Sequence, residues 1–321
     1  MWAWVFIAPA KLINLPRLRA TPSILYIVQM FLSRFPLKFK NYLSLVKFSH
    51  TLFSMPFAVT GYFLALAEPQ HHFSWHTLGL VLLAVLLARN TAMAFNRYAD
   101  RHFDAANPRT AGREIPARVI KARSALLFSL INAALFMGTA WLLNPLCFGL
   151  SPVALLVVMG YSYAKRFTAL AHIILGMGLS LSPIGAYLAV TGSFAITPVM
   201  LSLAVLFWVA GFDVIYALQD EAFDRSQGLL SIPARFGTRW SLAISSLLHL
   251  ISAGFLVVVS LRAFGAVSWM GTAVFLLLLA YQHVVVGNGR LERINLAFFT
   301  LNGIASVVFM VLAVTGMVAA I

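Results

Sequence analysis

The chain has 321 residues, of which 61% are hydrophobic and only 10% are charged, against about a quarter charged in soluble domains. This composition excludes a soluble enzyme, a disordered chain and a fibrous protein, and it indicates a polytopic membrane protein. The net charge of +14 is interpreted as basic loops against an anionic leaflet, because so apolar a chain offers no soluble basic face for nucleic acid. One cysteine excludes an intrachain disulfide.

Residues 1–40 are predicted to form a basic, partly apolar leader. Its apolar runs, 2–10 and 24–32, are too short to span a membrane, and the basic residues do not follow the order of a secretory signal. An amphipathic helix lying in the membrane interface and a poorly ordered extension both fit this pattern.

Nine apolar segments follow, and each is long enough to cross a hydrocarbon core of about 30 Å as a helix. Helices are required because unpaired backbone groups cannot face lipid. The sequence therefore predicts an all-α bundle of nine transmembrane helices around a central cavity, in a single domain over 41–321. The expected spans are 48–67, 77–95, 124–143, 146–163, 168–191, 196–217, 240–261, 266–286 and 295–318.

The basic residues set the orientation of this bundle. Of the 23 Lys and Arg residues, 21 precede the first span or lie in the connections after spans two, four, six and eight. Because basic loops stay in the cytoplasm, we expect a multi-pass protein of the inner membrane with a cytoplasmic N-terminus. No obligate protein partner is indicated.

The five aspartates fall in two short windows, and both windows end a span on the predicted cytoplasmic side. In the first window, Asn96, Asp100 and Asp104 are spaced four apart, which on a helix lines one face with oxygen atoms. Two carboxylates at that spacing repel each other unless a cation lies between them, and Mg²⁺ takes such ligands together with substrate phosphates. A solvated helix end with ion pairs to Arg97 and Arg101 explains the same pattern.

The second window favours the metal interpretation. Asp220 and Asp224 repeat the spacing of Asp100 and Asp104 at an offset of 120 residues, and an Ile-Pro pair follows each window. This indicates an internal duplication, with pseudo-repeats at about 41–165 and 166–290 followed by a final helix. Asp213 lies two helical turns before Asp220, deeper in the membrane, where an unpaired acid is costly and usually functional.

Two aspartate-rich helix ends on basic loops match a lipid diphosphate as the ligand. Mg²⁺ would neutralise the diphosphate and stabilise it as a leaving group, while basic side chains bind its remaining oxygens and apolar helices hold an isoprenoid tail.

Both windows resemble those of the UbiA superfamily of intramembrane aromatic prenyltransferases. The likeness rests on Asn96-x-x-x-Asp100-x-x-x-Asp104 with the following 107–116 segment, on Asp213-x-x-Tyr216-Ala-x-x-Asp220-x-x-x-Asp224, and on 47–57 and 161–168. It runs from about residue 41 to 318 and implies a bundle that opens laterally to lipid. It also implies Mg²⁺-dependent transfer of a polyprenyl group from its diphosphate to an aromatic acid. The branch of the family that this chain most resembles prenylates 4-hydroxybenzoate in ubiquinone biosynthesis.

The resemblance and the spacing together assign expected roles. The predicted metal ligands are Asn96, Asp100, Asp104, Asp220 and Asp224. The predicted diphosphate contacts are Arg97, Arg101, Arg109, Arg113 and Lys165. Asp213 and Arg89 are the predicted catalytic residues, and Tyr161 and Ser162 the predicted acceptor contacts.

Each of these roles has a simpler alternative. Arg89 is within two turns of a loop and could extend its guanidinium to the interface. Arg109, Arg113 and Lys165 could serve only as topology charges, and tyrosine is common at interfaces. His71, His72 and His76 lie in an outer loop far from the acids and indicate no zinc site.

Two departures from the best-known 4-hydroxybenzoate enzymes leave the acceptor open. The chain has Phe212 where those enzymes have Tyr, and Phe223 where they have a second acid. The variant resembles a sub-branch that includes enzymes prenylating 1,4-dihydroxy-6-naphthoate for menaquinone, and haem farnesylation is a further rival. A secondary transporter is the strongest different class, because transporters also place acids in repeated helices, although near the midplane and in inverted repeats.

Overall fold

The computed structural model describes residues 37–47, 54–263, 265–287 and 291–319. In these ranges the chain forms helices and no strands, as predicted. The helices are α2 (Leu37–Leu45), α3 (Met55–Leu66), α4 (Trp75–Ala99), α5 (Arg101–Ala106), α6 (Ala122–Leu143), α7 (Pro145–Ala164), α8 (Ala171–Thr191), α9 (Ile196–Ala217), α10 (Glu221–Ser226), α11 (Ile232–Ala263), α12 (Ala266–Val286) and α13 (Asn302–Val318). Short 3₁₀ turns cover Leu218–Asp220 and Leu291–Arg293, and a π-helix, Leu296–Leu301, precedes α13.

Eight of the described helices are long and apolar enough to cross a membrane. The predicted count of nine is not confirmed, because α3 has only 12 described residues and residues 48–53 of the predicted first span lie outside the described ranges. The predicted spans 124–143 and 146–163 are separate helices, α6 and α7, which meet at Asn144. Asn144 caps α7 by accepting a hydrogen bond from the Cys147 backbone N–H at 2.8 Å.

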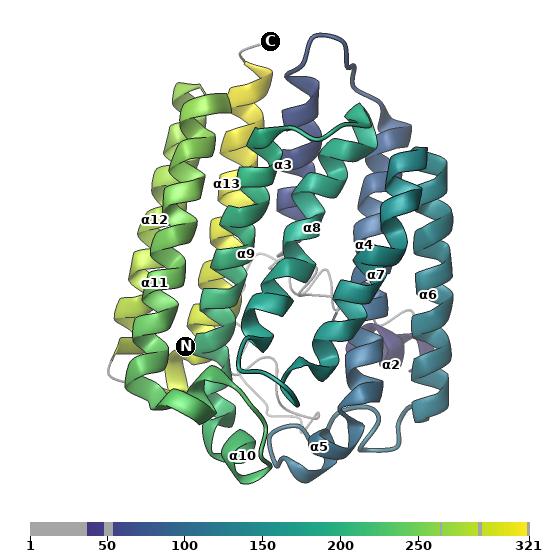
Figure 1. Cartoon of the computed structure of the whole chain (residues 1–321), viewed down its shortest axis with the longest axis vertical. Coiled ribbons are helices and arrows are strands. Elements are labelled where there is room, and N and C mark those ends of the chain that lie inside the picture. Colours follow the sequence, from purple (N-terminus) through teal and green to yellow (C-terminus); the bar gives the residue numbers. More distant parts are fainter. Residues whose placement is uncertain (1–36, 48–53, 264, 288–290, 320–321) are drawn as a thin grey trace, which may run out of the picture.

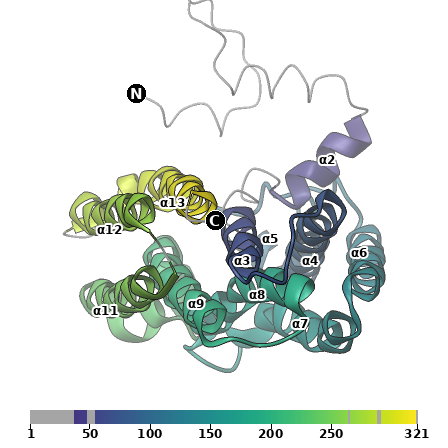
Figure 2. The same ribbon diagram turned by 90° about the horizontal axis from the view of Figure 1, so that it is seen from above.

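The long helices form a closed ring (Figures 1 and 2). In the order α3, α4, α6, α7, α8, α9, α11, α12 and α13 each helix packs against the next, and α13 returns to α3. Helix α3 also packs against α8 and α4 against α7, so contacts cross the ring. Leu156, Leu261 and Val284 are at least 70% exposed on the outside, as expected of side chains that face lipid.

The best-buried part of the bundle is an aromatic cluster between α3, α9, α12 and α13. The Trp208 ring lies 5.2 Å from that of Phe57 and 5.4 Å from that of Phe275, and Phe309 stacks on Phe57. Trp208 also donates its indole N–H to Asn302 at 2.9 Å. This satisfied polar contact ties α9 to α13 inside the membrane.

Of the predicted leader, residues 1–36 lie outside the described ranges, and α2 covers the last four positions. Helix α2 packs on the loop that follows α5. Leu45 is fully buried in a cluster with Ala94, Ile120 and Ala125, and Ser44 donates a hydrogen bond to Glu114 at 2.5 Å.

Both aspartate windows contain a helix break that the spacing alone did not predict. Helix α4 ends at Ala99 and α5 begins at Arg101, and α10 begins directly after Asp220. Asp100 and Asp220 occupy these junctions with nearly the same backbone angles, φ −93° and ψ 8° against φ −106° and ψ 4°. The acidic side chains of each window therefore do not lie along one continuous helix face. The helix bends at Asp100 in the first window and in the same way at Asp220 in the second.

Candidate functional site

The two short helices α5 and α10 lie at the same end of the bundle, at the bottom of Figure 1. Each carries the last aspartate of its window, Asp104 or Asp224, and both of these side chains are buried. The segments that follow the two windows therefore meet at one end, as the sequence predicted.

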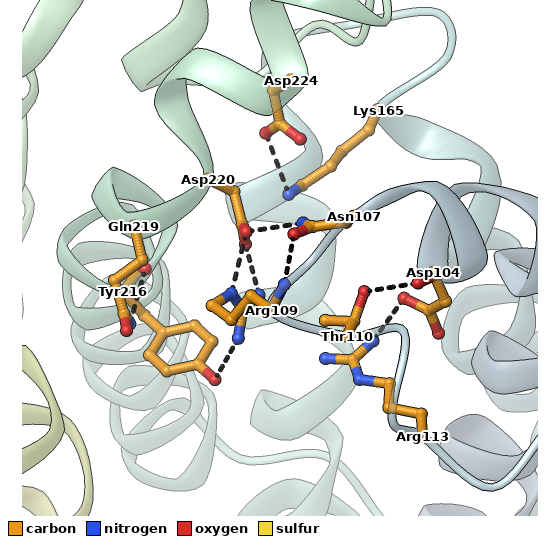
Figure 3. Close-up of polar contacts among 10 residues, drawn as sticks. All are labelled: Asp104, Asn107, Arg109, Thr110, Arg113, Lys165, Tyr216, Gln219, Asp220 and Asp224. Atoms are coloured by element: carbon orange, nitrogen blue, oxygen red, sulfur yellow. Dashed lines mark hydrogen bonds and ion pairs between the residues drawn. The ribbon is translucent and has the colours of Figure 1, made fainter. Parts of the chain in front are cut away.

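Asp220 lies at the centre of the contacts between the two windows (Figure 3). Arg109 donates Nε–H to Oδ1 at 2.9 Å and its terminal N–H to Oδ2 at 2.5 Å, and Asn107 donates to Oδ1 at 2.9 Å. Arg109 also donates to the Tyr216 hydroxyl at 3.1 Å and lies over that ring. The loop after the first window is thus bound to the second window.

Asp104 has a different basic partner, on its own loop. Arg113 donates to Oδ1 at 2.6 Å, and the Thr110 hydroxyl donates to the Asp104 backbone carbonyl at 3.0 Å. The second carboxylate oxygen, Oδ2, is buried and lacks a hydrogen-bond partner within the described ranges. An orphaned anionic oxygen in a buried position is costly unless a cation or donor completes it.

The other two carboxylates are also paired with basic groups, both from the end of α7. Lys165 lies 3.4 Å from Asp224, and Arg166 lies 3.3 Å from Asp100 while donating to the Ala99 carbonyl at 2.8 Å. Asn96 donates to Asp100 at 2.8 Å. Each of four aspartates at this end therefore pairs with a different basic residue. The four are Asp100, Asp104, Asp220 and Asp224.

Burial and charge act together on the groups at this end. Burial raises the pKa of the Asp100 carboxyl, and the nearby Asp104 carboxylate raises it further. For Lys165, burial alone lowers the pKa of the ammonium, but the carboxylates of Asp224, Asp213 and Asp220 outweigh it and raise the pKa. Lys165 is therefore held charged in the midst of three aspartates.

The predicted catalytic and acceptor residues lie further into the bundle. Arg97 and Ser162 are buried, and the Arg97 Nε, the Arg89 Nε and the Ser162 hydroxyl have no hydrogen-bond partner in the described part of the chain. Tyr161 lies among Arg97, Asp100, Arg89 and Asp213 as electrostatic neighbours. Tyr161 of α7 thus lies beside both Arg89 of α4 and Asp213 of α9.

The predicted diphosphate contact Arg101 and two hollows lie apart from this cluster. Arg101, the first residue of α5, turns back onto the end of α4, where it donates to the Tyr98 carbonyl at 2.7 Å and lies over the Tyr98 ring. A hollow of about 450 Å³ at the opposite end of the bundle is lined by Glu68, Tyr187 and Arg262, and an apolar hollow of about 510 Å³ lies between α4, α6 and α7.

The aspartate side chains fit a hard divalent cation in their chemistry. Carboxylate and amide oxygens are the ligands that Mg²⁺ takes, and the orphaned Asp104 oxygen could accept a bond from an ion. No three His, Cys, Asp or Glu side chains in the described ranges are grouped closely enough to hold one ion alone. Mg²⁺ commonly completes its shell with water and substrate phosphate, so a site made of two aspartate pairs suits a metal that arrives with a diphosphate.

Comparison with known proteins identifies the family. The model of the UbiA prenyltransferase family matches residues 54–304. The chain belongs to the UbiA prenyltransferase family. It is 30% identical to the 4-hydroxybenzoate octaprenyltransferase of Aeromonas hydrophila over 73% of this chain and 81% of the relative, and 32% identical to that of Tolumonas auensis over 74% and 82%.

Solved structures agree with this assignment. The apo structure of a UbiA homolog from Aeropyrum pernix K1 matches with a TM-score of 0.75 and 31% identity, covering 84% of this chain and 97% of that one. A UbiA homolog from Archaeoglobus fulgidus bound to GPP and Mg²⁺ matches with a TM-score of 0.69 and 21% identity, over 87% and 99%. The second likeness shows the fold. The protein is a multi-pass membrane prenyltransferase.

Sequence reasoning missed two contacts of this UbiA-family site. Asn107 is the loop residue that hydrogen-bonds Asp220, and its place directly before Pro108 in the basic loop was the available signal. His172 lies 2.7 Å from Asp213 and is completely buried. A lone histidine near the start of a predicted span gave no pattern from which this contact could be inferred.

Proposed function

We propose that this prenyltransferase moves a polyprenyl group from its diphosphate to 4-hydroxybenzoate, forming the 3-polyprenyl product in a Mg²⁺-dependent reaction. One observation carries the proposal: four aspartates from two windows lie at one end of the bundle, each held by a different Arg or Lys. Such an array matches a ligand that brings both metal cations and phosphate oxygens. The two octaprenyltransferase relatives support the aromatic acid as acceptor.

In this proposal Asn96, Asp100, Asp104, Asp220 and Asp224 hold Mg²⁺. When bound, Mg²⁺ supplies charge neutralisation that makes the diphosphate a stable leaving group. The structural homolog from Archaeoglobus fulgidus, bound to GPP and Mg²⁺, supports a divalent metal in this fold.

In the proposed reaction the basic residues pair first with the aspartate carboxylates and then with the diphosphate. Arg109, Arg113 and Lys165 neutralise the carboxylates in the ligand-free protein. With Mg²⁺ bound to the carboxylates, these basic side chains would be available for diphosphate oxygens, which Arg binds well with two parallel hydrogen bonds. Arg97, buried with an unpartnered Nε in the described ranges, is a further donor to the diphosphate. Arg101 is assigned a lesser part because it lies over Tyr98.

The acceptor is proposed to bind deeper, beside α4, α7 and α9. Arg89 would pair with the acceptor carboxylate, while Tyr161 and Ser162 contact the ring and its hydroxyl. The donor C–O bond breaks with its electron pair leaving on the diphosphate, and the ring carbon beside the hydroxyl forms the new C–C bond. Asp213 would accept the phenol proton, which makes that carbon more nucleophilic. After the C–C bond has formed, loss of the hydrogen on that carbon as a proton restores the aromatic ring.

A second acceptor, 1,4-dihydroxy-6-naphthoate, is favoured by the two departures in the second window. Phe212 is buried and packs edge-on against the rings of Trp208 and Phe298, and Phe223 replaces an acid that best-known 4-hydroxybenzoate enzymes have. Both changes remove polar groups beside Asp213 or Asp224. A larger, more apolar acceptor would suit that change.

We further propose that the aspartate end faces the cytoplasm in the inner membrane. The excess of basic residues on this side supports the orientation.

The deciding experiment is an assay of the purified protein in lipid nanodiscs. The protein is incubated with Mg²⁺, geranyl diphosphate and one acceptor, either 4-hydroxybenzoate or 1,4-dihydroxy-6-naphthoate, and the product is identified by mass. Prenylated 4-hydroxybenzoate supports the first proposal, and the naphthoate product alone supports the second. Absence of any prenylated product at saturating Mg²⁺ would reject both proposals and would favour a secondary transporter.

A further inference from the structure

His172 and Asp213 form a buried contact that neither window of the sequence describes. His172 lies in the first turn of α8, is fully buried, and approaches Asp213 of α9 with its Nδ1 at 2.7 Å from Oδ2. The Asp213 side chain is 18% exposed. One carboxylate oxygen is therefore bound to a buried ring while the side chain remains partly accessible.

The other nitrogen of the ring determines its protonation pattern. The backbone N–H of Ile232, at the start of α11, points at His172 Nε2 at 3.4 Å. A backbone N–H only donates, so Nε2 accepts and carries no proton. The proton of the neutral ring is then on Nδ1, which donates to Asp213. His172 thus links α8, α9 and the start of α11, and it satisfies one of the unpaired N–H groups of that helix end.

Basic and polar groups of α4 and α7 surround Asp213 on the side away from His172. Lys165 and Tyr161 are electrostatic neighbours of Asp213 on the side of α7, and Arg89 lies beside Tyr161. A neutral imidazole adds a hydrogen bond without adding a compensating charge. It therefore orients the Asp213 carboxyl group without forming an ion pair with it, and Oδ1 remains able to bind another group.

We propose that His172 is the positioning residue of Asp213, holding Oδ2 so that Oδ1 is presented to the acceptor hydroxyl. The inference rests on the proposed role of Asp213 as the base. His172 is not a proton relay, because its Nε2 is occupied by the Ile232 N–H and the ring has no solvent contact. Diphosphate takes the electron pair of the broken C–O bond, and the ring carbon that forms the new C–C bond loses its hydrogen as a proton to the released diphosphate, which restores the aromatic ring. Asp213 returns the phenol proton to the oxygen, so one proton is released per transfer.

The test compares His172→Gln with His172→Phe in the nanodisc assay. The Gln amide can donate to Asp213 and accept from Ile232 at once, whereas Phe fills the space without polar atoms. We expect Phe to lower kcat by roughly tenfold to a hundredfold, the fold-change for one lost hydrogen bond to a charged group. KM for geranyl diphosphate should change little, and Gln should retain most of kcat. His172→Asn, whose shorter amide cannot reach both partners, replaces Phe if that variant does not fold.

A second readout separates positioning from a structural role. A ring-fluorinated 4-hydroxybenzoate has a more acidic phenol and needs less help from a base. The ratio of wild-type to His172→Phe rates should therefore be smaller on the fluorinated acceptor, and a merely loosened fold would lower both rates equally. Equal ratios, or a Gln variant as slow as Phe, would overturn the proposal.

The same ratios are measured on 1,4-dihydroxy-6-naphthoate, so a wrong acceptor and a wrong role for His172 give different results. If only the naphthoate is prenylated, the proposed acceptor fails while the His172 comparison still stands on that substrate. If Asp213→Asn prenylates at the wild-type rate, Asp213 is not the base and the positioning role is overturned with it.

Discussion

Arg109 and Asp220 are 111 residues apart in the sequence and form an ion pair through two parallel hydrogen bonds, at 2.9 and 2.5 Å. Arg109 belongs to the loop after the first aspartate window and Asp220 to the second window. Because the Arg109 side chain is 31% exposed and that of Asp220 only 10%, the guanidinium covers the carboxylate from the outside. A ligand that binds Asp220 would therefore lie beside Arg109.

We predict that Arg109→Lys raises KM for geranyl diphosphate by roughly tenfold or more, because lysine cannot reproduce the paired hydrogen bonds of the guanidinium. Initial rates over a range of donor concentrations measure this directly. Arg225→Lys is the matched control, since Arg225 makes an exposed ion pair with Glu221 one turn away and should leave KM unchanged. A wild-type KM in Arg109→Lys would remove Arg109 from the donor site.

Metal removal gives the second prediction. Treatment with a chelator should abolish prenyl transfer, and added Mg²⁺ should restore it. Asp104→Asn should need roughly tenfold more Mg²⁺ or more for half-maximal rate, because it loses a charged oxygen that is orphaned in the ligand-free protein. Glu292→Gln, an exposed acid near the same end, serves as the control. Full activity in chelator would contradict the metal proposal.

The long helices could be predicted closely from the sequence. The expected spans 124–143 and 196–217 correspond to α6, Ala122–Leu143, and α9, Ile196–Ala217. Their apolar runs end at polar or proline residues, so composition alone defines them. The first span was predicted less closely, because α3 is short. The expected span 240–261 matches the part of α11 that follows Gly237, where φ is +74° and the backbone is not helical.

The pairing inside the site could not be read from the sequence. Arg101, Arg109 and Arg113 are similar loop charges by position, yet one folds onto Tyr98 and the others hold Asp220 and Asp104. Those choices depend on contacts between segments that are distant in the chain. The contacts of His172 depend on the packing of α8 against α9 and on the hydrogen bond from Ile232 at the start of α11, which no local pattern encodes.

The orientation of the bundle gives a prediction that needs no substrate. In a Cys147→Ser background, a single cysteine at His72 should react with a membrane-impermeant maleimide added to intact cells, and one at Arg118 should react only after lysis. Both positions are exposed and lie at opposite ends of the bundle. The labelling of each variant is followed by gel shift. The reverse pattern would place the aspartate end outside the cell.

The last prediction concerns the approach of α8 to α9. A Cβ added at Gly176 would come within 2.4 Å of the Leu206 backbone carbonyl oxygen, so the helices could not keep their present distance. Gly176→Ala should cost about 1–3 kcal/mol, the usual penalty for overpacking, and it should lower the midpoint of thermal unfolding in detergent.

Gly176 lies one turn after His172, so the same substitution should also lower kcat by moving the His172 ring away from Asp213. Gly185→Ala on the same helix is the control, because an added Cβ there has nothing within 4 Å. If Gly176→Ala unfolded at the wild-type temperature, α8 and α9 could move apart without a loss of stability. The His172–Asp213 contact would then not depend on the close packing of these two helices.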